Sequence, residues 1–130
     1  MLTLPPSVKI YVATAPIDMR RSFDALAGLA RDAVGIDATT GHLFVFFGRH
    51  RDKVKILFWD RTGWCLYYKR LELGTFRLPV VPLGTTAIEL ASADLALILE
   101  GIDLGRSARR PRYRPRPTEA SKPDVGRSDP

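Results

Sequence analysis

The sequence has few residues that could form a disulfide bond or bind a structural metal ion. It contains one cysteine and two histidines in 130 residues, which excludes an internal disulfide and gives no ligand set for a structural zinc site. We therefore expect neither a cofactor nor a bound metal. Long apolar runs are also missing from the first 17 residues, where each run is broken early by Pro5, Pro6, Lys9 or Pro16. A signal peptide or membrane span needs a longer run, so we expect a cytoplasmic protein with no membrane partner.

What the sequence does contain predicts one small globular domain. Its residues are 45% hydrophobic and 9% aromatic, enough for a single core. The net charge of +6 is uneven, because residues 105–130 hold eight basic and three acidic residues, a net +5. That segment has five prolines and only Tyr113 as a large apolar residue, so it cannot bury enough surface to offset its ordering entropy. We expect a folded domain over residues 1–104 and a disordered, extended basic tail over 105–130.

Charge is also divided within the domain. Residues 49–77 contain eight basic and three acidic residues, whereas residues 78–103 contain four acidic residues and no basic one. One part of the domain is therefore basic and the other acidic.

The pattern of apolar residues predicts an α+β fold. Apolar positions recur at helical spacing over residues 19–34 and again after Ser92, with Asp18 and Ser92 as expected helix caps. Branched and aromatic runs predict strands at 8–12, 42–47, 53–60, 64–71 and 85–90, and a short edge strand at 76–81. The resulting order, β-α-β-β-β-(β)-β-α, indicates an antiparallel β-meander with both helices packed on one face.

The register of the hairpin between residues 53 and 71 determines which side chains lie on the exposed face of the predicted sheet. Residues 60–63 suit a three-residue turn with a glycine bulge, which places Lys55 opposite Lys69 and Leu57 opposite Tyr67. Two like charges facing each other are unfavourable, and a polyanion lying on that face would remove the repulsion. Lysines interleaved with Trp59 and Tyr67 suit phosphate contacts and base stacking. The alternative is that the lysine stems simply cover apolar surface.

These considerations give a set of candidate DNA-binding residues in two groups. No element that would read bases is visible, so we expect weak sequence specificity. His50 lies in the same basic loop and is either a phosphate ligand or a solvated residue. The hairpin group is Arg49, Arg51, Lys53, Lys55, Trp59, Tyr67, Lys69 and Arg70, and the tail group is Arg106, Arg109, Arg110, Arg112, Arg114 and Arg116.

Enzymatic alternatives are weaker. A metal-dependent nuclease would need two or three converging carboxylates, and the candidates are Asp18, Asp24, Asp52, Asp60 and Glu72. Caps, turns and loops explain most of them without a metal. Cys65 is most simply a small apolar residue, with no histidine placed to activate it. Arg20 and Arg21 oppose the dipole of the first helix, which indicates a partner for them: an internal acid such as Asp24, or an external phosphate.

Several sequence blocks resemble a known family. The run Pro16-Ile17-Asp18-Met19-Arg20-Arg21-Ser22-Phe23-Asp24-Ala25-Leu26, the blocks 41–46, 52–60 and 66–72, and the run Leu99-Glu100-Gly101-Ile102-Asp103 resemble the TnpB accessory proteins, encoded by the second open reading frame of the insertion sequence sixty-six family of bacterial transposable elements. The resemblance covers about residues 8–104. It implies a protein encoded beside a transposase and needed for efficient transposition. The family has no agreed catalytic residues, so none is carried over.

From the residues and the resemblance together, we expect a non-enzymatic transposition accessory protein that binds DNA. The alternative is an adaptor that docks the transposase of the same element through the acidic, apolar second helix and exposed aromatic residues. The sequence leaves the oligomeric state open.

Overall fold

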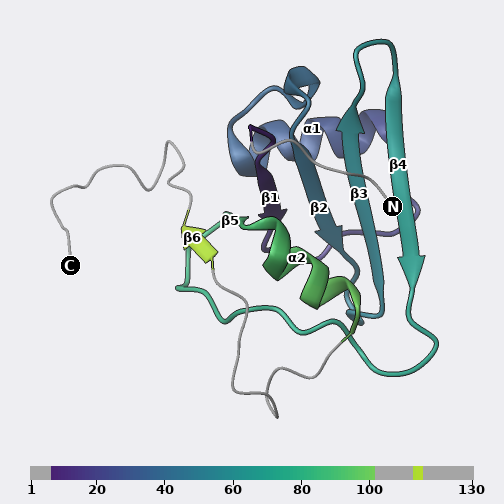
Figure 1. Cartoon of the computed structure of the whole chain (residues 1–130), viewed down its shortest axis with the longest axis vertical. Helices are drawn as coiled ribbons and strands as arrows, with labels where there is room; N and C mark the ends of the chain where they lie inside the picture. The colour runs from purple at the N-terminus through teal and green to yellow at the C-terminus, as the bar shows by residue number, and fades with distance from the viewer. Residues whose placement is uncertain (1–6, 102–112, 116–130) are drawn as a thin grey trace, which may run out of the picture.

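The fold is a mixed β-sheet covered by one helix on each side, seen in a computed structural model that describes residues 7–101 and 113–115 (Figure 1). The sheet order is β4-β3-β2-β1-β5-β6, and the α+β class is confirmed. The elements are β1 (Ile10–Ala13), α1 (Phe23–Val34), the 3₁₀ turn η1 (Ala38–Thr40), β2 (Leu43–Phe47), β3 (Lys53–Trp59), β4 (Trp64–Arg70), β5 (Ala87–Leu90), α2 (Ser92–Leu99) and β6 (Tyr113–Pro115).

The pairing of β1 with β2 departs from the predicted meander. β2, β3 and β4 pair antiparallel as predicted, but β1 runs parallel to β2 and antiparallel to β5. The connection containing α1 carries the chain back across the sheet, as a parallel pair requires. The strand predicted at 76–81 is absent, since residues 71–86 contain no helix or strand.

The two helices lie on opposite faces of the sheet, so the prediction that both cover one face was wrong. α1 packs Leu26, Ala30 and Val34 against one face, and α2 packs Leu95, Ile98 and Leu99 against the other. All five residues of β2 are buried. A continuous apolar strand of this kind needs a covering layer on each side, which a single helical layer could not supply.

The register of the β3–β4 hairpin differs from the predicted one by one residue. Trp59 lies opposite Trp64, and Lys55 lies opposite Tyr68. The connection therefore has four residues, with Arg61 in the left-handed region at φ 83°. A shift of one residue moves every side chain of one strand to the other face. Lys55 and Lys69 consequently lie on opposite faces, and the predicted repulsion between them does not exist.

Both helices begin differently from the prediction. α1 starts four residues later than expected, with Ser22 rather than Asp18 at its N-cap, and α2 has Ala91 at its N-cap and Ser92 inside the helix. The segment before α1 is thereby left as a loop over the sheet. Within the described parts of the chain, no helix is long and apolar enough to cross a bilayer.

Candidate nucleic-acid interface

The sheet topology gathers basic side chains at one end of the sheet. Because β1 and β2 are parallel, the loops that follow them leave from the same end, where β3 begins and β4 finishes. We call this region the basic end. Its basic residues are Arg20 and Arg21 from the loop before α1, Arg49 and Arg51 from the β2–β3 turn, Lys53 at the start of β3 and Arg70 at the end of β4.

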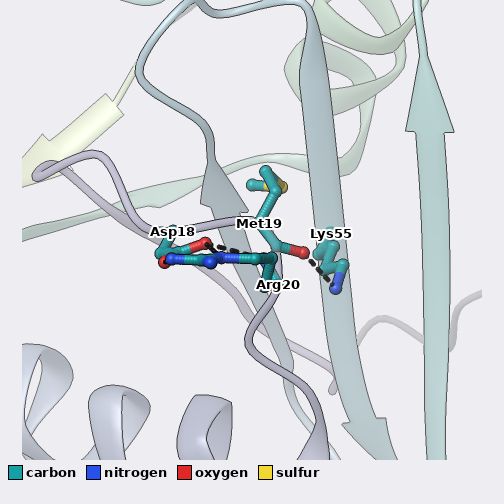
Figure 2. Close-up of polar contacts among 4 residues, drawn as sticks. All are labelled: Asp18, Met19, Arg20 and Lys55. Carbon is teal, nitrogen blue, oxygen red and sulfur yellow. Dashed lines mark hydrogen bonds and ion pairs between the residues drawn. The ribbon is translucent and has the colours of Figure 1, made fainter.

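Lys55 holds the loop of the basic end in place rather than facing solvent. Its side chain is buried, with the residue only 6% exposed. The ammonium Nζ donates hydrogen bonds to the carbonyl oxygens of Met19 and Arg21, each at 2.7 Å, and lies 4.7 Å from the ring centre of Tyr68. Figure 2 shows the ammonium directed at the Met19 carbonyl. Lys55 is therefore a positioning residue for the loop, not an exposed phosphate ligand.

Asp18 stabilises the same loop through its contacts with Arg20. Its carboxylate accepts hydrogen bonds from the backbone N–H of Arg20 at 2.9 Å and from the Arg20 guanidinium, with an ion-pair distance of 2.7 Å (Figure 2). These side-chain and backbone hydrogen bonds hold the pKa of Asp18 well below its usual range. Asp18 is therefore not a helix cap, and the internal acid expected to pair with Arg20 is Asp18 rather than Asp24.

Three arginines of the basic end lie outside the ion pairs formed among the described residues, and the charge of one of them, Arg21, contributes to the low pKa of Asp18. Lys53 lies 3.6 Å from Asp52, and Arg70 lies 3.3 Å from Glu72, whereas Arg21, Arg49 and Arg51 form no ion pair with any described residue. Arg51 also has φ 61°, a backbone conformation that costs a non-glycine residue roughly 1–2 kcal/mol. Arg21 and Arg49 are exposed and can meet an external anion, whereas Arg51 is half-buried and lines a second pocket beside Val12, Ile88 and residues 78–81.

A pocket of about 400 Å³ lies between the two loops of the basic end. The bridge between Ile17 and Gly48 joins these loops, and Gly48 leaves room for Met19, whose Cγ would lie 3.0 Å from a Cβ built there. The pocket has apolar and charged walls, and exposed His50 is part of it. Its lining residues are Pro16, Ile17, Asp18, Met19, Gly48, Arg49, His50, Asp52 and Lys53.

The other hairpin candidates lie away from the basic end. Trp59 packs edge-on against Trp64 at the opposite end of the hairpin, with ring centres 4.9 Å apart. Tyr67 and Lys69 lie on the α2 face. The Lys69 ammonium donates to the Leu99 carbonyl oxygen at 2.7 Å, where a cation also complements the dipole at the end of α2. The structure therefore does not bring the eight hairpin candidates onto one face.

Most tail candidates cannot be placed. Arg114 lies in β6, where it pairs with Glu89 of β5 in the backbone register. This short strand belongs to the segment predicted to be disordered. Arg106, Arg109, Arg110, Arg112 and Arg116 lie outside the described residues.

The residues considered for catalysis are not assembled into a site in the described part of the chain. Residues 7–101 and 113–115 contain no cluster of three or more His, Cys, Asp or Glu side chains that could hold a metal ion. Burial and the neighbouring Asp60 carboxylate raise the pKa of the Cys65 thiol, which disfavours the nucleophilic thiolate. Its Sγ donates weakly to Asp60 at 3.5 Å.

Arg20 and Arg21 were not among the predicted DNA-binding residues. One feature of the sequence pointed to them, because two arginines at the start of an expected helix oppose its dipole. Their proximity to Arg49 and Lys53 depends on the parallel pairing of β1 with β2, which the local pattern did not indicate.

Comparison with known proteins identifies the family. The profile described as IS66 Orf2 like protein matches residues 8–109. Two proteins of Sinorhizobium fredii (strain NBRC 101917 / NGR234), both described as uncharacterized, are similar along most of their length. Protein y4jC is 35% identical over 108 residues, covering 83% of this chain and 91% of its own. Protein y4hO is 36% identical over 119 residues, covering 92% and 98%. No solved structure matches the chain. The chain thus belongs to the IS66 Orf2-like family, which indicates an accessory role associated with transposition and is not a known enzyme family.

Proposed function

We propose that this protein binds the phosphate backbone of DNA through its basic end during transposition. The observation that carries the proposal is that Arg21, Arg49 and Arg51 come from loops at one end of the sheet and form no ion pair with any described residue. Guanidinium groups suit phosphate because they offer several N–H donors in a planar fork.

The arrangement of the basic end favours phosphate contacts that are already positioned before binding. The Arg21 backbone is fixed by Lys55 at 2.7 Å, and Arg49 and Arg51 sit in a short turn closed by the bond from the Arg51 N–H to the Gly48 carbonyl oxygen at 3.0 Å. A loop that is ordered in advance loses less entropy on binding. Phosphate contacts orient a protein on DNA without reading its sequence, so we propose weak sequence preference.

The arginine-rich tail is the second element of this proposal. Six tail arginines (Arg106, Arg109, Arg110, Arg112, Arg114 and Arg116) add positive charge beyond the domain. They would strengthen binding at low salt, since each phosphate neutralised releases a counterion.

A salt titration of duplex binding separates the two contributions. The full chain is compared with a variant in which the six tail arginines become glutamine. We expect the tail variant to bind more weakly, with a shallower salt dependence, but still to bind at low salt through the basic end. Absence of binding by the unmodified full chain at low salt would exclude the proposed function. Loss of all binding in the tail variant would assign the activity to the tail instead.

A second candidate function is an adaptor for the transposase of the same element. The apolar side of α2 is not available for this role, because Leu95, Ile98 and Leu99 are buried on the sheet. Instead, the β4–β5 connection exposes Leu73 (90%), Val80 (87%) and Leu83 (104%), and we propose this segment as the docking surface. Copurification with the transposase, lost in Leu73→Ser/Leu83→Ser and kept in Phe23→Ser, would support this function; retention in both variants would exclude this surface.

A further inference from the structure

β4 is an unusually open sheet edge. It is the last strand of the sheet on its side, so no described strand pairs with its outer edge. Its seven residues run in continuous register with β3, and none of them is proline. The opposite edge is β6, only three residues long and ending in Pro115, which are two features that protect an edge from further pairing. β4 has neither.

The hydrogen-bond pattern of the hairpin shows which residues of β4 face outward. The Asp60 N–H donates to the Gly63 carbonyl oxygen at 3.1 Å, and at the other end the Leu71 N–H donates to the Asp52 carbonyl oxygen at 2.8 Å. Bonded and non-bonded pairs alternate along an antiparallel ladder. Cys65, Tyr67 and Lys69 therefore bond to β3, and the outward N–H and C=O groups belong to Trp64, Leu66, Tyr68 and Arg70.

The side chains along this edge do not block a further strand. Tyr67 is 37% exposed and Tyr68 is 52% exposed. Lys69, the sixth of the seven residues of β4, has its ammonium held by the Leu99 carbonyl oxygen at 2.7 Å, so this charge does not oppose an incoming strand. Arg70 lies at the last position of the strand.

We propose that a second copy of this chain pairs with β4, antiparallel and two-fold symmetric about Tyr67. In a two-fold arrangement the same strand supplies both sides of the contact. Centring it on Tyr67 places Leu66 opposite Tyr68 of the second copy and Trp64 opposite its Arg70. Every outward backbone group of the strand then finds a partner. A shift of the register by two residues leaves one outward residue of each copy unpaired.

Side-chain chemistry favours the same register. Tyr67 lies opposite Tyr67 of the second copy, at a position where the two residues share no backbone hydrogen bonds and the strands are closely spaced. This position suits an aromatic pair. Arg70 of each copy lies opposite Trp64 of the other, where a cation–π attraction between the guanidinium and the indole ring is favourable. Lys69 faces Cys65, so no like charges oppose each other. The pairing joins two sheets into one and points the two basic ends in opposite directions; it is independent of whether they bind DNA.

A cysteine placed at the two-fold axis tests the register in the full chain. Cα atoms of a non-bonded antiparallel pair lie about 4.5 Å apart, within the range of a disulfide. We expect Cys65→Ser/Tyr67→Cys to form a covalent dimer on mild oxidation. The control Cys65→Ser/Leu73→Cys carries an exposed thiol away from the edge. The unmodified chain should stay uncross-linked, because its two Cys65 residues would lie four positions apart along the joint sheet. Equal cross-linking of the control, or none at position 67, would overturn the proposal.

Sedimentation equilibrium of the full chain tests the association itself. We expect a dimer at protein concentrations of roughly 100 µM, because a contact of one strand with another is small and small interfaces are typical of weak complexes. Tyr67→Lys opposes two like charges at the axis and should give a monomer, whereas Leu73→Lys adds the same charge elsewhere and should remain dimeric. Circular dichroism verifies that both variants fold. A monomeric unmodified chain, or a dimer unaffected by Tyr67→Lys, would contradict the proposal.

Discussion

Lys55 is the residue that most clearly links sequence, fold and proposed function. It is a buried lysine whose ammonium has two backbone carbonyl oxygens as hydrogen-bond acceptors and a tyrosine ring beside it. Lysine is rarely buried unless such partners are present. The sequence indicated an exposed lysine because its partners, Met19 and Arg21, are more than 30 residues away in the chain.

Replacing Lys55 with methionine should both destabilise the fold and loosen the loop. The substitution leaves the Met19 and Arg21 carbonyl oxygens without their donor, which we expect to lower the free energy of unfolding by about 1–3 kcal/mol. Urea denaturation measures this change. The control is Lys53→Met on the same strand, where the ion pair with Asp52 is partly exposed and 3.6 Å long, and the expected loss is below about 0.5 kcal/mol. Equal effects of the two substitutions would contradict the assigned role of Lys55.

His42 should make the stability depend on pH just below neutrality. Its Nδ1 accepts a hydrogen bond from the Lys9 N–H at 3.0 Å. Burial and, second, the Lys9 charge lower the pKa of His42 in the folded protein. The unfolded chain therefore binds a proton first as the pH falls below the ordinary histidine pKa of about 6.5. The stability is complete above that pH and decreases towards acid.

The measurement is the free energy of unfolding between about pH 7 and pH 5, above the range in which carboxylates titrate. We expect a decrease for the unmodified chain and a flatter profile for His42→Asn, whose side-chain oxygen can accept the same hydrogen bond without titrating. Identical slopes in the two proteins would show that His42 is not the group responsible.

The β3–β4 hairpin shows how the length of a turn determines which side chains of a strand lie on each face of the sheet. A three-residue bulged turn and the observed four-residue connection differ by one position, and this difference moved Tyr67 and Lys69 to the face opposite Lys55. The three-residue turn was predicted because the face of the sheet that α1 covers was assumed to be exposed to solvent. Since that face is covered by α1, Leu57 and Leu66 belong on it.

The four-residue connection can be tested at Arg61, which has φ 83°. A β-branched residue is strongly disfavoured there, so Arg61→Val should lower the free energy of unfolding by about 1–2 kcal/mol. Arg61→Gly should change it by less than about 0.5 kcal/mol, because relief of strain is offset by the entropy of glycine in the unfolded chain. Thermal or urea denaturation of both variants decides. An unchanged free energy of unfolding in Arg61→Val would argue against the left-handed conformation at this position.

Most of the elements could be predicted from their sequence, whereas their arrangement could not. Five strands and two helices lie within a few residues of the positions expected from apolar spacing, because that spacing reflects which side of each element is buried. The strand expected at 76–81 does not form, and Pro79 within it and Pro82 directly after it lack the N–H groups that a ladder needs. The parallel pairing of β1 with β2 and the placement of the helices on opposite faces depend on contacts between distant segments.

The same limit applies to the candidate site. Basic composition between residues 49 and 77 drew attention to Arg49, Arg51 and Lys53, which the fold places at the basic end. It could not separate them from Lys55, Trp59 and Lys69, which the fold uses for internal contacts. Nor could it add Arg21, since that residue joins the group only through tertiary structure.

The molecule as a whole is a nearly neutral domain with a concentrated basic end, and its central proposed activity is phosphate binding at that end. The most direct measurement is a salt titration of duplex binding with two full-chain variants of equal charge. Arg21→Ala/Arg49→Ala removes from the basic end two guanidinium groups that form no ion pair with any described residue. Lys9→Ala/Arg31→Ala removes two positive charges from exposed positions elsewhere.

If the basic end binds DNA, the first variant should bind more weakly, and the slope of log affinity against log salt should fall by about 2, one for each lost phosphate contact. The second variant should keep the slope of the unmodified chain. Equal slopes in both variants and the unmodified chain would contradict the account.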